Sequence, residues 1–290
     1  MAFSTTIKTL TLSSGENIFY REAGFVHLPT ILLLHGFPSS SHQYRNLIPI
    51  LSLHYRVIAP DLPGFGFTCT PINYTHTFDN LATTISTFLA QVPSPPQAYS
   101  IYMFDYGAPV GFRLALEHPE RVQAIITQNG NAYVDGLGAF WDPVKTLWTS
   151  SNSASARDAL RPFLEIGGTK SQYFDGTPDA NSIAPESYTL DQYLLDQGNN
   201  KEIQLDLFYD YRTNVDKYPE WQAWLKKSQV PLLAAWGKND AIFVKAGAEA
   251  FKRDVPDAEV HLLDAGHFVV ESHAREIGAL ILGFLGRKGI

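Results

Sequence analysis

The chain of 290 residues is long enough for one large α/β domain, or for a core with an inserted lid. Its net charge of −7 argues against nucleic acid and anionic membrane surfaces as partners, and its single cysteine, Cys69, excludes an internal disulfide framework. The first residues lack the pattern of a signal peptide, and no run of 18 apolar residues predicts a transmembrane span. We therefore expect a cytoplasmic protein that does not bind membranes.

Predicted strands and helices alternate through the first part of the chain. Residues 4–22 alternate apolar and polar side chains around a turn at 14–17, which is typical of two antiparallel strands. Continuous apolar runs then predict buried strands within 30–36, 56–61, 99–104 and 122–127. Helical segments are expected between them, at 41–52, 77–91 and 108–118. This alternation indicates an α/β fold with a doubly wound, mostly parallel sheet.

The alternation stops after Asn129. From residue 130 to about 219 no buried strand is predicted, and the segment is rich in aromatic residues and in Asp, Asn and Gln. Because a structureless insert of this length is implausible in a compact domain, we predict a helical cap over 130–219, between core segments 1–129 and 220–290. Cap helices are expected at 138–149, 154–165, 185–196, 200–213 and 219–227. The sheet resumes at 230–236, and a strand at 259–263 and a helix at 273–285 close the chain.

Asp105 stands where an apolar run ends and a helix rich in small residues begins. This is the layout of a nucleophile elbow, the strand-to-helix turn that exposes one reactive side chain above a sheet. A carboxylate is ionised at pH 7 without a base, so an aspartate at this turn predicts attack on a saturated carbon and an ester of the enzyme itself. The alternative interpretation of Asp105 is a helix N-cap.

Two further residues follow predicted strands in the order nucleophile, acid, histidine, which is the chain order of α/β-hydrolases. Asp240 follows the strand at 230–236, where a carboxylate can orient an imidazole. His267 follows the last strand and can act as a general base near neutral pH, although either residue alone could be an ordinary loop residue. The string His-Gly-Phe-Pro at 35–38 predicts an oxyanion hole built from the backbone N–H groups of Phe37 and Tyr106.

With these residues the chain resembles the α/β-hydrolase superfamily, in its branch of epoxide hydrolases and haloalkane dehalogenases. The motifs that carry the resemblance span nearly the full length: His-Gly-Phe-Pro (35–38), Ala-Pro-Asp-Leu-Pro-Gly-Phe-Gly (59–66), the Asp105 turn, Trp-Gly-Lys-Asn-Asp (236–240) and Gly-His-Phe (266–268). The resemblance implies that Asp105 is the nucleophile, Asp240 the charge-relay acid and His267 the general base. It also implies a helical cap between the sixth and seventh strands.

The leaving group separates the two kinds of enzyme, because an epoxide needs an acid at its ring oxygen. The segment 208–214 resembles the aromatic-Tyr-Arg-Asn segment of epoxide hydrolases, which assigns that acid to Tyr211, with Tyr209 as a rival that could also bind substrate. A packing role is the alternative for Tyr211. The family's other cap tyrosine would be expected around 150–155, where no tyrosine occurs. Trp148 is the nearest aromatic residue and can offer its indole N–H to the substrate, and Tyr173 is the alternative if the cap folds differently.

Dehalogenases resemble the chain less well beside the nucleophile. They usually have tryptophan directly after it, where this chain has Tyr106, and many have asparagine where this chain has Phe37. We therefore predict an epoxide hydrolase that gives vicinal diols from a small apolar epoxide, without cofactor or metal, as a monomer or homodimer. The alternatives are a haloalkane dehalogenase acting on an alkyl halide and, in another class, a catalytically silent ligand-binding protein on the same fold.

Overall fold

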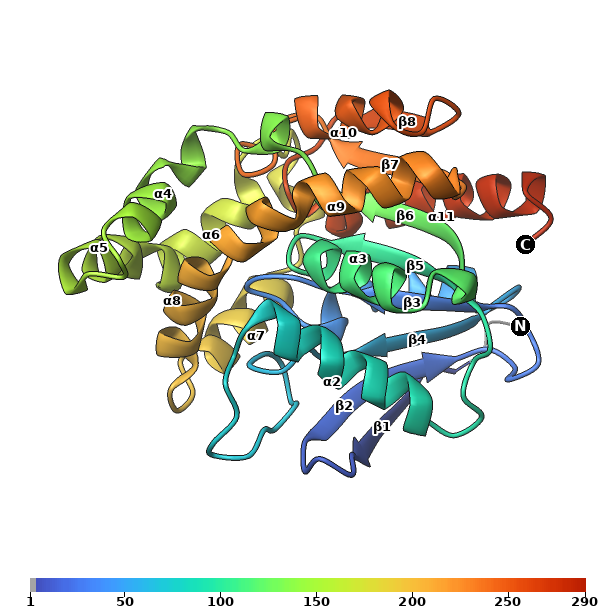
Figure 1. The fold of residues 1–290 in the computed structure, drawn as a ribbon, viewed down its shortest axis with the longest axis horizontal. Helices are drawn as coiled ribbons and strands as arrows, with labels where there is room; N and C mark the ends of the chain where they lie inside the picture. Colours follow the sequence, from blue (N-terminus) through green and yellow to red (C-terminus); the bar gives the residue numbers. More distant parts are fainter. Residues whose placement is uncertain (1–3) are drawn as a thin grey trace.

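The computed structural model describes residues 4–290. Residues 1–3 lie outside them; the predicted first core segment begins there, and the expectation of no signal peptide rests partly on them. Within the described chain, one sheet of eight strands has the order β1-β2-β4-β3-β5-β6-β7-β8 (Figure 1). The strands are β1 (Thr6–Thr11), β2 (Asn17–Ala23), β3 (Thr30–Leu34), β4 (Arg56–Pro60), β5 (Tyr99–Phe104), β6 (Val122–Gln128), β7 (Leu232–Gly237) and β8 (Glu259–Leu263).

The pairing of the strands confirms the predicted sheet. β1 pairs antiparallel with β2, and β2 pairs antiparallel with β4. From β4 to β8 every neighbouring pair is parallel, with Leu34 opposite Met103 where β3 meets β5. The parallel strands therefore end at one edge of the sheet, where ligands bind in α/β folds.

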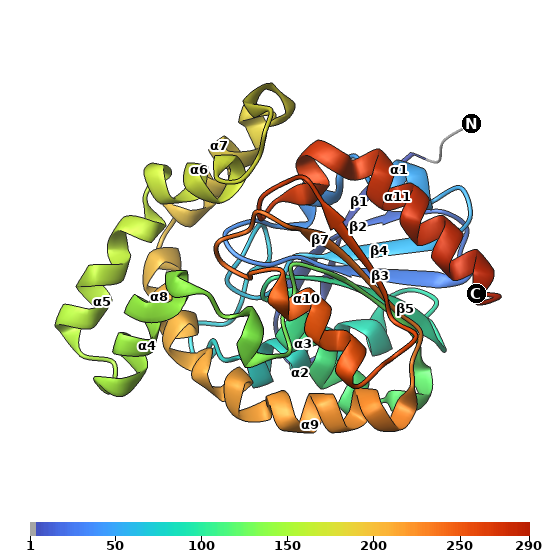
Figure 2. The ribbon, with the colours of Figure 1, turned by 90° about the horizontal axis from the view of Figure 1, so that it is seen from above.

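Helices cover both faces of the sheet, as Figure 2 shows: α1 (Ile48–Leu51) and α11 (Val269–Arg287) lie on one face, and α2 (Phe78–Gln91), α3 (Gly107–Glu117) and α10 (Ala246–Ala250) on the other. The alternation of side chains along β3 produces two apolar cores. Ile31 and Leu33 belong to the core that includes Ile277 of α11, whereas Leu32 and Leu34 belong to the core that includes Ile85 of α2. The helix expected at 41–52 is in fact a 3-10 turn followed by the short α1.

A cap of helices lies over the edge where the parallel strands end, and its residues are inserted in the sequence between β6 and β7 (Figures 1 and 2). Its helices are α4 (Asp142–Thr149), α5 (Ala154–Leu160), α6 (Ile166–Phe174), α7 (Pro185–Leu195), α8 (Asn200–Asp210) and α9 (Arg212–Ser228). The sequence does not predict α6, because Gly167 and Gly168 in its first turn weaken any helical pattern. The other expected cap helices are present with shifted ends.

The last cap helix, α9, continues into the core. We expect this helix to begin at Pro219, yet it begins at Arg212 and passes through the proline. Proline removes one backbone donor, but the turns that follow pack firmly on the core. The Trp221 ring stacks on Phe112 at 5.1 Å between centroids, and Gln222 Nε2 donates to the Ala132 carbonyl at 2.8 Å. The expected cap boundary at 219 thus falls inside one continuous helix.

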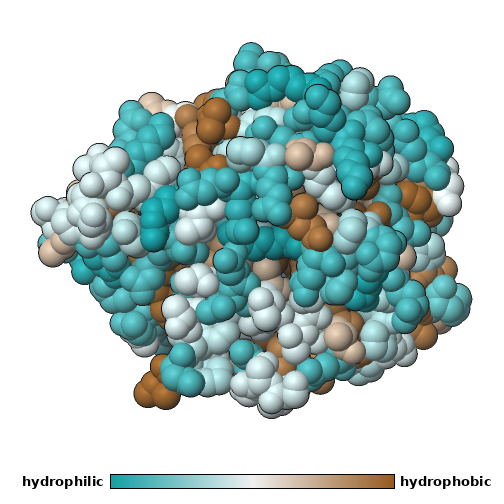
Figure 3. Space-filling view, viewed as in Figure 1, coloured by the Kyte–Doolittle hydropathy of each residue, from teal (hydrophilic) through white to brown (hydrophobic). Residues whose placement is uncertain are grey.

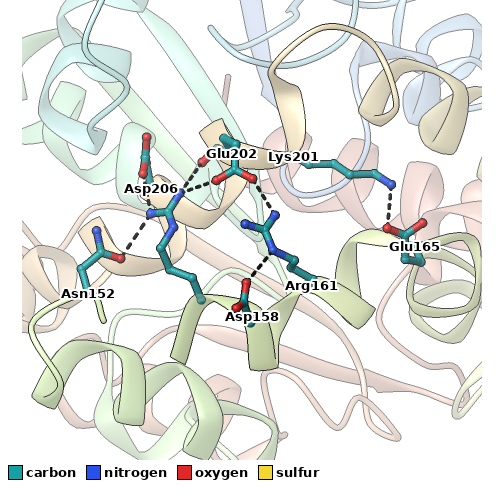
Figure 4. Close-up of polar contacts among 8 residues, drawn as sticks. Asn152, Asp158, Arg161, Glu165, Lys201, Glu202 and Asp206 are labelled. Carbon is teal, nitrogen blue, oxygen red and sulfur yellow. Dashed lines mark hydrogen bonds and ion pairs between the residues drawn. The ribbon is translucent and has the colours of Figure 1, made fainter. Parts of the chain in front are cut away.

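An ion-pair cluster joins the outer helices of the cap. Arg161 pairs with Asp158 and Glu202 (Figure 4), and Arg157 pairs with Glu202 and Asp206. Exposed pairs of this kind contribute little to stability, so the buried contacts between cap and core matter more. Apolar residues are scattered over the mostly hydrophilic face that Figure 3 shows. Between residues 4 and 290, no helix has the length and apolar character that a membrane crossing requires.

Candidate active site

Asp105 occupies a tight turn between β5 and α3. Its φ of 48° lies in the left-handed region, which is strained for a residue with a side chain and is common at functional turns. Two glycines make room for this turn. A Cβ on Gly36 would lie 2.2 Å from Asp105 Oδ1, and a Cβ on Gly107 would lie 2.2 Å from the Leu34 carbonyl oxygen. The turn has the form of a nucleophile elbow.

The two backbone N–H groups of the predicted oxyanion hole both hydrogen-bond to the Asp105 carboxylate. The backbone N–H of Phe37 donates to Asp105 Oδ1 at 2.7 Å, and the backbone N–H of Tyr106 also hydrogen-bonds to this carboxylate. His35 supports the loop, because its Nε2 accepts from the Leu62 N–H at 2.9 Å. Oδ1 thus accepts from Phe37, whereas Oδ2 lies 3.7 Å from His267 Nε2.

Asp240 and His267 complete the predicted triad. His267 Nδ1 lies 2.8 Å from Asp240 Oδ2, and His267 Nε2 lies 3.7 Å from Asp105 Oδ2. All three side chains are buried. Asp240 accepts from Nδ1–H, so Nε2 is left as the acceptor, and this atom has no hydrogen-bond partner within the described chain. The structure therefore brings Asp105, Asp240 and His267 together in the order that the sequence predicts.

Asn129 is a residue of this site that the sequence analysis does not predict. Its Nδ2 donates to Asp240 Oδ2 at 2.7 Å, and its Oδ1 accepts from the Gly237 N–H at 2.9 Å. The N–H of Ile242 donates to the other oxygen, Asp240 Oδ1, at 2.7 Å. These donors hold the acid in place beside His267. The only signal in the sequence is position, since Asn129 directly follows β6 as Asp105 directly follows β5.

Burial and charge shift the pKa values of the nucleophile and the base. Burial raises the pKa of Asp105 to about 6, while His267 and the N–H donors of Phe37 and Tyr106 limit the rise. Burial alone lowers the pKa of His267, but Asp240, by charge and hydrogen bond, together with the charge of Asp105, outweighs burial and raises it. Loss of the Asp105 charge would therefore lower the pKa of His267.

Tyr211 lies against Tyr106, the residue after Asp105, and contacts other aromatic rings. Its ring centroid is 4.3 Å from that of Trp141 and 5.8 Å from that of Tyr106. Its hydroxyl lies 3.1 Å from the Tyr218 hydroxyl, which in turn accepts from Asn131 Nδ2 at 3.2 Å. Burial, Tyr218 and the charge of Asp105 raise the pKa of Tyr211 well above its usual value. The phenol therefore stays protonated and can donate, while Tyr218 can donate to its oxygen.

The other aromatic candidates lie farther from the nucleophile or are already engaged. Trp148 stacks on Tyr211, but its indole N–H donates to the Phe208 carbonyl at 2.7 Å, so the expectation that it offers this N–H to a substrate is wrong for this structure. Tyr209 lies under the guanidinium of Arg212, 3.7 Å from ring centroid to Cζ, and lines a groove at the cap surface. Tyr173 hydrogen-bonds to Asp191. Among these residues, Tyr211 is the one whose ring contacts that of Tyr106, the residue after Asp105.

A small hollow reaches the general base from the cap side. It has a volume of about 50 Å³, and its lining includes His267, Asp240, Ile242 and Gln172. This volume is enough for at least one water molecule. The hollow can therefore hold a water molecule beside the His267 imidazole.

Comparison with known proteins identifies the family. The family model described as alpha/beta hydrolase fold matches residues 29–274. The chain belongs to the α/β-hydrolase family. A relative from Saccharomyces cerevisiae, named an uncharacterized hydrolase, is 47% identical over 96% of this chain and 97% of its own length.

Two further comparisons involve a haloalkane dehalogenase and an epoxide hydrolase. A haloalkane dehalogenase from Bradyrhizobium diazoefficiens is 26% identical to this hydrolase over 93% of this chain and 91% of its own length. The crystal structure of an epoxide hydrolase from Vigna radiata superposes with a TM-score of 0.75, at 22% identity, over 98% of each chain. The similarity to the Vigna radiata structure shows a shared fold. Neither of the two similarities decides which reaction this hydrolase catalyses.

Proposed function

We propose that this hydrolase is an epoxide hydrolase that forms an ester on Asp105 and releases a vicinal diol. The observation that carries the proposal is the buried phenol of Tyr211 in contact with Tyr106, the residue after Asp105. A phenol with a raised pKa can hydrogen-bond to or protonate the oxygen of an opening epoxide ring. A departing halide takes no proton, so a tyrosine acid suits the epoxide better.

In the first step Asp105 Oδ2 attacks a carbon of the epoxide. The new C–O bond forms as the ring C–O bond breaks, and its electron pair moves to the ring oxygen. Tyr211 gives its proton to that oxygen and becomes a phenolate, which the neighbouring Tyr218 hydroxyl can stabilise at 3.1 Å. Oδ1 remains in the oxyanion hole as the carbonyl oxygen of the new ester.

In the second step water attacks the ester carbonyl. His267 Nε2, oriented by Asp240 at 2.8 Å from Nδ1, takes the proton of the water. The N–H groups of Phe37 and Tyr106 hold the resulting oxyanion, and such a donor contributes about 3 kcal/mol in comparable sites. The diol leaves with the proton from His267. The proton that the regenerated Asp105 acid loses returns to Tyr211, so the step balances.

A haloalkane dehalogenase remains the second candidate, because the Bradyrhizobium diazoefficiens relative with that name matches this chain over nearly its whole length. A halide needs N–H donors around it. The two indoles nearest to Tyr211 are engaged elsewhere: Trp141 donates to the Ile242 carbonyl at 2.9 Å and Trp148 to the Phe208 carbonyl at 2.7 Å. These contacts favour the epoxide.

The test is to trap the ester in a His267→Gln variant, which can alkylate Asp105 but lacks the base. Incubation with a panel of aliphatic and styrene-type epoxides is expected to raise the mass by the full substrate mass, located by peptide mapping to Asp105. Bromoalkanes would instead add the substrate mass less that of hydrogen bromide. The double variant that also carries Asp105→Ala is the control and should gain no mass.

Each outcome separates the candidates. Adducts from epoxides with the predicted mass support the proposal. Adducts from bromoalkanes alone, with bromide release by the wild type, would favour the dehalogenase. No adduct from either panel would favour a silent ligand-binding protein.

A further inference from the structure

The side chain of Tyr106 has no assigned role, although its backbone N–H belongs to the predicted oxyanion hole. The residue is 1% exposed, and its hydroxyl has no hydrogen-bond partner in the part of the chain that the structure describes. A buried hydroxyl without a partner destabilises the folded protein, so its presence needs an explanation. A ligand that supplies an acceptor would provide one.

The surroundings of the Tyr106 ring are aromatic. Its centroid lies 4.9 Å from Phe78, 5.8 Å from Tyr211 and 6.1 Å from Phe37. Two of these rings carry no oxygen, and the Tyr211 oxygen is engaged with Tyr218. Burial and the charges of Asp105 and Asp210 raise the pKa of Tyr106 well above its usual value, so the phenol remains a donor. Tyr106 thus carries a protonated donor on a ring that contacts Tyr211, and it directly follows Asp105 in the chain.

We propose that the Tyr106 hydroxyl is the second hydrogen-bond donor to the oxygen of the opening epoxide ring, paired with Tyr211. The assignment rests on the proposed epoxide hydrolase function. Tyr106 belongs to the core and directly follows the nucleophile. Its hydroxyl would take the place of the cap tyrosine that is expected around 150–155 but does not occur there. Tyr211 transfers its proton to the ring oxygen, and Tyr106 donates a hydrogen bond to the same oxygen without losing its own proton. The two donors share the negative charge that develops as the ring C–O bond breaks.

The test compares Tyr106→Phe with a matched control, Tyr99→Phe. Tyr99 also carries a buried hydroxyl without a partner within residues 4–290, but it lies at the opposite end of β5 from Asp105. Rapid-quench mixing with a styrene-type epoxide measures ester formation and ester hydrolysis separately. Tyr106→Phe should slow ester formation by about 10–100-fold, because a hydrogen bond to a developing charge is lost, and leave ester hydrolysis unchanged. Tyr99→Phe should change neither rate.

A leaving-group series provides a second readout that a structural role would not produce. The loss in Tyr106→Phe should be larger for propylene oxide than for its trifluoromethyl analogue, whose weakly basic alkoxide needs less support. Removal of an unpartnered hydroxyl leaves the ring contacts intact, so thermal unfolding of Tyr106→Phe should match that of the wild type or exceed it.

These measurements distinguish a failure of the Tyr106 assignment from a failure of the proposed function. Ester formation at the wild-type rate in Tyr106→Phe, with a normal ester on Asp105, would overturn this assignment and leave the proposed function standing. An equal loss in both rates, or in both variants, would also overturn it, because a donor to the ring oxygen acts in one step only. A wild type that forms no ester with any epoxide would overturn the proposed function, and with it this assignment.

Discussion

Asp105 must be ionised to attack carbon, and its burial opposes that ionisation. The pKa of about 6 means that the carboxylate predominates at neutral pH but not in mild acid. The charged form of His267 lowers the pKa of Asp105, so in the proposed mechanism the base of the second step also favours ionisation of the nucleophile for the first. The pKa of each of these two residues therefore depends on the charge of the other.

The first prediction concerns the pH dependence of ester formation. Below pH 6 the rate should fall with the ionised fraction of Asp105, by about tenfold at pH 5 relative to pH 8. In His267→Gln the charge that lowers the pKa of Asp105 is gone, so the midpoint should move upward. Rapid-quench measurement of ester formation from pH 4.5 to 9 checks both. A rate independent of pH across this range would contradict the assigned role of Asp105.

The second prediction concerns Asn129 as a positioning residue. Asn129→Asp would place a second carboxylate 2.7 Å from Asp240, where both cannot stay charged. The support of Asp240 for His267 should weaken, so ester hydrolysis should slow by about tenfold or more while ester formation changes less. Asn239→Asp is the control, since Asn239 Nδ2 also donates to a carboxylate, that of the exposed Asp264, at 2.9 Å. Equal effects of the two substitutions would refute the role.

At the scale of elements, two buried polar clusters hold the cap on the core. Asp191 of α7 hydrogen-bonds to Tyr173 of α6 and, at 3.2 Å, to Ser39 of the core. The Tyr173 ring stacks on Phe268 at 4.0 Å between centroids, one residue from the general base. In the other cluster, Arg45 and Glu271 of the core meet Ser187 of α7. The position of the cap is therefore coupled to the residues beside the triad.

The third prediction concerns the second of these clusters. Arg45 binds both oxygens of the buried Glu271, at 2.7 and 2.8 Å. Glu271→Gln leaves the arginine charge largely buried without its partner and should lower the free energy of unfolding by about 3 kcal/mol. The matched control is Glu259→Gln, which breaks a more exposed pair with Arg287 and should cost less than about 1 kcal/mol. Urea denaturation measures both, and equal losses would contradict the assigned difference.

The sequence predicts the main elements and the triad for the same physical reason. Asp105, Asp240 and His267 each follow a strand with a recognisable apolar run, and parallel strands bring such residues to one edge of the sheet. Asn129 has the same position but a side chain without distinctive chemistry. The hydrogen bond that engages the Trp148 indole depends on how α4 meets α8, which no local pattern encodes.

At the scale of the whole molecule, one buried carboxyl ties stability to pH. Burial raises the pKa of Asp191 from 3.8 to about 7, while Tyr173 and Ser39 limit the rise. The folded protein therefore holds this proton more tightly than the unfolded chain does. The resulting stabilisation is fully present below pH 4 and is lost as pH rises through 7.

The fourth prediction follows from this linkage. Asp191→Asn cannot ionise, so the free energy of unfolding of the wild type, relative to this variant, should fall as pH rises from 4 to 8. Denaturant titrations at several pH values measure the difference. Asp142→Asn, which alters a carboxylate with 70% of its side chain exposed, is the control and should give a nearly constant difference. A constant difference for Asp191→Asn as well would refute the linkage.

A single turnover in ¹⁸O-labelled water tests whether Asp105 forms the ester with the substrate. With enzyme in excess over a reactive epoxide, water enters the carboxylate and the new diol oxygen comes from Asp105 Oδ2. We therefore predict an unlabelled diol and one ¹⁸O in the peptide that contains Asp105. A labelled diol from the first turnover, with Asp105 unlabelled, would contradict the ester.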